Sequence, residues 1–132
     1  MDADRNVSAG ARGEAYLVVD GDQRPILFTN RALADAERLT GKTVLQLMRG
    51  VQNNEISMSD VVQILLVGME HARRETRTGG PAYSIRDAWA VMDACGFGTV
   101  TARVMEAVSA VMAYEGGKAA DESPPLGTGS VS

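Results

Sequence analysis

Apolar and polar positions near the start of the chain follow the pattern of a hairpin. The run Glu14–Val19 contains Ala, Tyr, Leu and two Val residues, which favour strands. Asp20-Gly21 follows and is typical of a tight turn, because glycine adopts positive φ without steric cost. Arg24–Phe28 fits the return strand, with Pro25 near its start, where loss of a backbone N–H is tolerated. The hairpin must pack on other elements, because an isolated hairpin is marginal in water.

Apolar residues recur at helical spacing from residue 29 onwards. The first predicted helix follows the N-cap residue Thr29 and ends at Gly41. A short second helix begins after Thr43 and ends at Gly50. The polar segment Val51–Glu55 is predicted to be a loop.

The middle of the chain predicts a long apolar helix. Ser57 and Asp60 match a Ser-x-x-Asp capping box, and residues 61–69 are apolar almost all round the helix. Such a helix is usually buried at the centre of its domain. Gly68 interrupts the apolar run, and the charged stretch Glu70–Arg77 is expected to extend into water.

Two further helices are predicted after the break at Thr78–Pro81. Ser84 and Asp87 match a second capping box, and Gly96 ends the helix that they begin. The apolar face of this helix consists of Ile85, Ala88, Trp89, Met92 and Cys95. Thr99 is the expected cap of the last helix. The apolar stripe of the last helix consists of Val100, Val104, Val108, Val111 and Met112.

Together these elements predict a mainly α (α+β) fold, with an N-terminal β-hairpin followed by about five short helices in one domain. We expect a flexible leader at residues 1–13, the folded domain at 14–115 and a disordered tail at 116–132, because both ends are small and polar. A length of 132 residues fits one domain, and the sequence contains no internal repeat.

Charge and composition argue against some classes of binding partner for this protein. A net charge of −4 and a pI near 4.9 argue against a nucleic-acid partner, which usually requires a basic excess. No apolar run approaches the ~20 residues that span a bilayer, the one in the central helix being Ile64–Val67, and the first residues lack a signal-peptide core. The single cysteine, Cys95, allows no internal disulfide and fits a reducing compartment. We therefore expect neither a nucleic-acid nor a membrane partner.

No residue pattern in the chain predicts a catalytic, cofactor-binding or metal site. His71 is the only histidine and lacks a partner at metal-binding spacing, so we interpret it as a solvated surface residue. The helical neighbours of Cys95, which are Trp89, Val91 and Met92, are apolar and predict a buried, inert thiol. Gly96-Phe97-Gly98 lies between two helices rather than after a strand, so it predicts a helix–helix turn and not a phosphate loop.

Charged residues have structural interpretations. Arg73, Arg74 and Arg77 form a small basic cluster that Glu70 and Glu75 flank, and the Glu70–Arg74 spacing suits a helical ion pair. We expect a solvated helix face, with contact to a phosphate or an acidic partner as the alternative. The remaining carboxylates, expected at caps or on helix surfaces, are Asp35, Glu37, Asp60, Asp87 and Glu106.

Seven methionines are many for a chain of this length. Six of them lie in or beside predicted helices: Met48, Met58, Met69, Met92, Met105 and Met112. Core filling is one interpretation, and an adaptable binding surface is the other. Met105 lies one position off the apolar stripe of the last helix, so it either widens that face or contacts a partner.

The order of the elements resembles a known family. Residues 29–41 read Thr-Asn-Arg-Ala-Leu-Ala-Asp-Ala-Glu-Arg-Leu-Thr-Gly, residues 57–69 read Ser-Met-Ser-Asp-Val-Val-Gln-Ile-Leu-Leu-Val-Gly-Met, and residues 83–88 begin the next helix. Over residues 14–114 the chain is similar to the small tail assembly chaperones of long-tailed bacteriophages and gene transfer agents. The motifs are short, and their order and spacing carry the resemblance.

The resemblance implies a non-catalytic helical protein without cofactors. Such a protein binds the tape measure protein and recruits tail tube subunits during tail morphogenesis, then leaves before the tail is complete. It acts in the host cytoplasm and is absent from the mature virion, and its self-association is left open. Many members also exist in a longer form made by a ribosomal slip of one nucleotide. Gly116-Gly117-Lys118 can be encoded by a run such as G-GGA-AAG, so we hypothesise a programmed frameshift there, with a plain helix terminus as the alternative.

Three other interpretations remain open. The first is a head–tail connector or tail completion protein that stays in the virion. The second is a small bacterial helical adaptor, and the third is a small enzyme, which no sequence feature favours.

Overall fold

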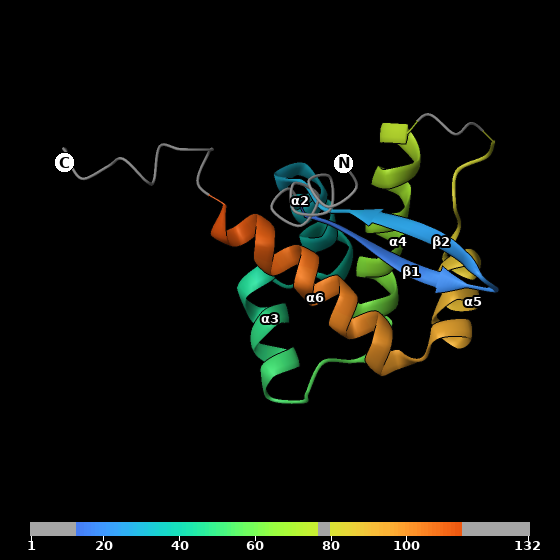
Figure 1. Cartoon of the computed structure of the whole chain (residues 1–132). Coiled ribbons are helices and arrows are strands. Elements are labelled where there is room, and N and C mark those ends of the chain that lie inside the picture. The colour runs from blue at the N-terminus through green and yellow to red at the C-terminus, as the bar shows by residue number, and fades with distance from the viewer. Residues whose placement is uncertain (1–12, 77–79, 115–132) are drawn as a thin grey trace.

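The computed structural model describes residues 13–76 and 80–114. Its elements in chain order are β1 (Glu14–Val19), β2 (Asp22–Leu27), α2 (Asn30–Thr40), α3 (Val44–Gln52), α4 (Met58–Thr76), α5 (Ile85–Cys95) and α6 (Phe97–Ala113). The predicted class is confirmed: an N-terminal antiparallel hairpin is followed by five helices in one domain (Figure 1). Apart from Gly13, the expected leader and tail lie outside the described residues.

The hairpin has the predicted turn. Asp20 and Gly21 both adopt positive φ, 52° and 83°, as a two-residue hairpin turn with a matching twist requires. The return strand begins at Asp22 rather than Arg24, because Asp22 pairs with Val19 and lengthens the ladder. Alternate residues of β1 are buried: Ala15, Leu17 and Val19.

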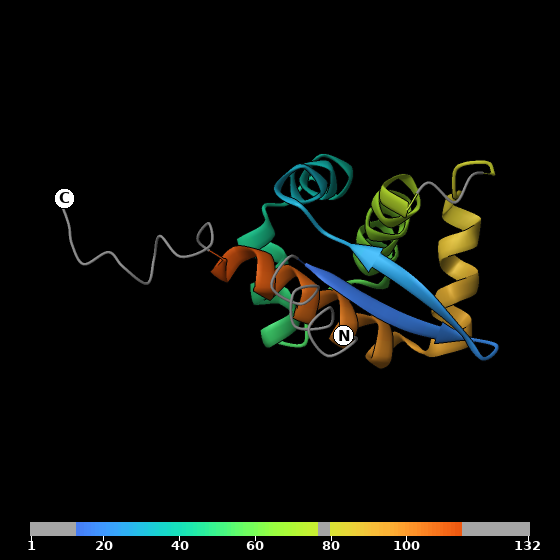
Figure 2. The same cartoon turned by 45° about the horizontal axis from the view of Figure 1, so that its top comes forward.

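The central element is α4, as the apolar pattern predicted. It contacts β2, α2, α5 and α6. Figures 1 and 2 show α4 behind the hairpin, with α2 on one side and α5 on the other. Gly68 does not interrupt this helix. A Cβ there would lie 2.6 Å from Cζ of the fully buried Phe28, so the glycine instead makes room for the aromatic ring.

Two predicted capping boxes have different outcomes. At α5 the box is complete, because Ser84 and Asp87 each accept a hydrogen bond from the other's backbone N–H. At α4 only half of it forms: Ser57 Oγ accepts from the backbone N–H of Asp60 at 3.0 Å. The carboxylate of Asp60 is instead paired with Lys42, with 2.9 Å between Oδ2 and Nζ. Asp60 is buried, so this pair ties the loop before α3 to the first turn of α4.

Two predicted helix boundaries were wrong. The helix α3 continues to Gln52, so the loop is shorter than Val51–Glu55. The last helix begins at Phe97 rather than after Thr99. Gly96, with φ of 93°, explains the second difference, because its N–H bonds to the carbonyl of Met92 while its own carbonyl accepts from Val100. One glycine therefore ends α5 and begins α6, as the predicted helix–helix turn required.

The buried face of α5 differs from the predicted one. Its buried residues are Ala88, Val91 and Met92. Trp89 and Ile85 are 38% and 42% exposed. The helix is rotated so that Val91 packs inward against the domain. Both faces of this helix carry apolar residues, so the sequence pattern did not distinguish them.

Candidate functional site

A groove of about 430 Å³ lies between α2 and α4. Residues of α4 form its floor, α2 forms one wall, and Ala82 and Tyr83 border the other side. Leu66 and Val67 contribute apolar surface to the floor, and Leu39 contributes it to the wall. The groove also gathers five charged or titratable side chains: Asp35, Arg38, Glu70, His71 and Arg74.

His71 is a partner of Asp35 and not a solvated residue, so that interpretation was wrong. Its side chain is only 13% exposed, and its Nε2 lies 2.9 Å from Oδ2 of Asp35. This hydrogen bond lowers the pKa of Asp35, and the nearby charges of Arg38 and Arg31 lower it further. The pair joins α4 to α2 along one wall of the groove.

Glu70 is the centre of a second polar network. It is buried, and both of its carboxylate oxygens accept hydrogen bonds from Nε of Arg73, at 3.1 and 3.0 Å. The backbone N–H of Tyr83 donates to Oε1 at 2.8 Å, and Arg74 Nε lies 3.4 Å from Oε2. The hydrogen bond from Arg73 is the main cause of the lowered pKa of Glu70. This network fixes the segment before α5 against α4.

The basic cluster is therefore only partly a solvated face. Arg73 is 18% exposed because it pairs with the buried Glu70, whereas Arg74 is 63% exposed, as expected. The Glu70–Arg74 ion pair is confirmed. Arg77 lies outside the described residues.

Other carboxylates have the expected local roles. Glu37 Oε2 accepts a hydrogen bond from the backbone N–H of Val44, so it caps the start of α3 from the preceding helix. Glu106 is paired with Arg103 on the surface of α6. Within residues 13–76 and 80–114, no group of three or more His, Cys, Asp or Glu side chains is placed to hold a metal ion.

Cys95 is half-buried, and its Sγ donates to the carbonyl oxygen of Val18 at 3.3 Å. Burial raises the pKa of this thiol, which disfavours the thiolate that a nucleophile would need. The contact joins the end of α5 to β1. The thiol is therefore half-buried rather than fully buried as expected.

The methionines divide between core and surface. Met69 and Met92 are buried, and Met48 and Met105 pack against the core, so Met105 widens the inward face of α6. Two methionines are exposed: Met58 and Met112. Core filling therefore accounts for four of the six methionines named above. The two exposed methionines remain available for contact with a partner.

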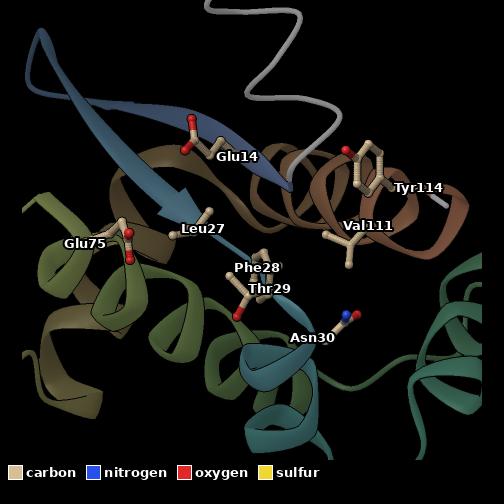
Figure 3. A pocket seen from close by; sticks show the side chains of 8 residues that line it. All are labelled: Glu14, Leu27, Phe28, Thr29, Asn30, Glu75, Val111 and Tyr114. Atoms are coloured by element: carbon tan, nitrogen blue, oxygen red, sulfur yellow. The ribbon is translucent and has the colours of Figure 1, made fainter. Parts of the chain in front are cut away.

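A second depression, of about 470 Å³, lies where β2, α2 and α6 meet (Figure 3). Glu14 and Glu75 lie on one side of it, and Asn30, Val111 and Tyr114 lie on the other (Figure 3). The two carboxylates come from different elements, and no hydrogen bond in the described part of the chain joins them. Sequence spacing could not indicate this site, because its lining residues span the whole domain.

No helix in the described ranges combines the length and the apolar character needed to cross a membrane. Comparison of the chain with protein-family models, curated proteins and solved structures gave no match. The sequence pattern and the geometry above are therefore the basis for a functional proposal.

Proposed function

We propose that this chain is a non-catalytic tail assembly chaperone, which binds the tape measure protein and recruits tail tube subunits during tail morphogenesis. The resemblance over residues 14–114 supports the proposal, and the observed order of hairpin and helices is compatible with it. The observation that carries it is the set of large apolar side chains that folding leaves exposed. On the helices these are Leu39, Leu45, Met58, Ile85, Trp89 and Met112.

This surface suits a protein that covers another chain for a limited time. A tape measure protein is long and largely helical, and its apolar stripes promote aggregation when they are not covered. Leucine and methionine side chains adapt to different apolar surfaces. Each contact is small, so release remains easy, while several copies along one tape measure chain give a strong combined interaction.

The proposal also covers where the protein acts and which forms of it the gene produces. The chaperone acts in the host cytoplasm and leaves before the particle is complete. A minor longer form arises from a ribosomal slip at Gly116–Lys118, a segment outside the described residues. An N-terminal tag and the native downstream DNA would show this form as a second, larger band, whose mass spectrum diverges after Lys118.

The main alternative is a connector or tail completion protein that stays in the virion. Quantitative mass spectrometry of producing cells and of purified particles separates the two. We expect the chain in the cell extract and in unfinished tails, but not in finished particles. A fixed number of copies in every finished particle would contradict the chaperone proposal and favour the connector.

A further inference from the structure

We propose that the groove between α2 and α4 is the docking site for an amphipathic helix of a partner, whose apolar stripe is flanked by carboxylates. This inference rests on the proposed function and deepens it, because the helix would belong to the tape measure protein. Three features of the groove support it: its shape, its apolar floor and its charge.

The groove has the construction that a helix requires. The helix α4 supplies half of the lining residues, and α2 and the segment before α5 supply the others. Leu66 and Val67 lie on the floor, and Leu39 on the wall is 51% exposed. A partner helix fills such a groove with apolar side chains spaced three and four residues apart.

The charge of the groove favours an acidic partner. Its two carboxylates, Asp35 and Glu70, are already paired inside the protein. Four arginines act on these two carboxylates: Arg31, Arg38, Arg73 and Arg74. The lining of the groove balances two arginines, Arg38 and Arg74, against these two carboxylates. The carboxylate side chains are only 27% and 12% exposed, so the accessible charge of the groove is that of the arginines, although the whole chain has a net charge of −4. An incoming carboxylate meets guanidinium groups, whereas an incoming lysine would be repelled.

Two of these arginines are accessible at the rim. The side chain of Arg38 on α2 is 72% exposed, and that of Arg74 on α4 is 63% exposed. Within the described ranges, the terminal nitrogens of Arg74 make no hydrogen bond, so they remain able to grip a carboxylate. Rim charges of this kind mainly set specificity and the rate of association.

The direct test uses helical peptides of about five turns, displayed as a library with random residues along one face and its flanks, and selected on the full chain. We expect the selected peptides to carry Leu or Met on the face and Glu or Asp beside it. Leu39→Glu and Arg74→Ala should each weaken binding about tenfold or more, which corresponds to about 1.4 kcal/mol. The matched control for the arginine, Arg49→Ala on the exposed side of α3, should bind as the wild type does.

Several outcomes would overturn the inference. One is a selection that yields only basic peptides or no binding peptides. Another is a set of selected peptides whose affinity is the same for the wild type and for Leu39→Glu. Competition by a peptide of residues 115–132, or dimerisation that Leu39→Glu abolishes, would assign the groove to the chain's own tail or to a second copy. Circular dichroism and thermal unfolding of each variant establish that it is folded before its binding is compared.

Pull-down of the full-length tape measure protein separates this inference from the proposed function. If the wild type and Leu39→Glu both retain the tape measure protein, the function stands and the groove inference fails. If the wild type does not retain it while the peptides bind the groove, the proposed function fails and the docking site stands.

Discussion

His71 and Asp35 are 36 residues apart in the sequence, yet the imidazole Nε2 and the carboxylate Oδ2 lie 2.9 Å apart. The hydrogen bond joins the central helix α4 to α2 at the wall of the groove. It therefore connects the stability of the domain to the shape of its candidate binding surface.

The first prediction concerns this pair. His71→Ala and Asp35→Ala should each destabilise the protein by about 1 kcal/mol, because each removes a partly buried hydrogen bond between the imidazole and the carboxylate. Urea unfolding of the two single variants and the double variant measures their coupling. We expect a coupling energy of about 0.5–1.5 kcal/mol. Strictly additive effects would contradict a direct interaction.

The second prediction concerns Glu70. Glu70→Gln should destabilise the protein by about 2 kcal/mol at neutral pH, because it leaves the guanidinium of Arg73 poorly paired in a largely buried site. The lowered pKa of Glu70 adds a pH dependence. Its stabilising contribution is fully present above the ordinary carboxyl pKa of 4.5 and is lost as the pH falls through the lowered value.

The measurement is urea unfolding of wild type and Glu70→Gln over a pH series from neutral to acid. The difference in free energy of unfolding should be constant near neutral pH and should shrink below about pH 4.5. Glu106→Gln is the matched control, because its pair with Arg103 is exposed and contributes little. A difference for Glu70→Gln that stays the same at every pH would contradict the assigned role.

The third prediction compares two helical glycines. Gly68→Ala should destabilise the protein by about 1–2 kcal/mol, because overpacking against Phe28 outweighs the better helix propensity of alanine. Gly98→Ala should instead stabilise it by up to about 1 kcal/mol, since a Cβ there meets no described atom within 4 Å. Thermal unfolding measures both. Stabilisation by Gly68→Ala would show that a Cβ at residue 68 fits beside the ring of Phe28 and would contradict this prediction.

The fourth prediction concerns the outer face of α5. Trp89 is the only tryptophan and is partly exposed, so iodide should quench the fluorescence of the native protein. Met92→Ala, on the buried face, should cost about 2–4 kcal/mol. A native tryptophan that iodide cannot reach would place Trp89 in the core, as the sequence pattern had suggested.

Local features of the fold could be predicted from the sequence because local chemistry determines them. The Asp20-Gly21 turn, the N-cap at Thr29 and the Gly96 junction each depend on one or two residues with restricted backbone geometry. The apolar character of α4 likewise showed which helix would be central.

Contacts between distant segments could not be predicted in this way. Lys42 pairs with Asp60, and His71 pairs with Asp35, only because the helices pack as they do. The orientation of α5 was also missed, since Trp89 and Val91 both lie on apolar stripes and only tertiary packing selects between them. The groove is built from such contacts, so no sequence motif marked it.

The most direct test of the proposed chaperone function is the effect of this chain on the solubility of the proposed partner, a tape measure protein. A tape measure protein encoded in the same genome as this chain is expressed alone, with the wild-type chain, and with the Leu39→Glu variant. We predict that the tape measure protein is insoluble alone and becomes soluble and co-purifies with the wild-type chain. A tape measure protein that stays insoluble and never co-purifies with the wild-type chain would contradict the chaperone function.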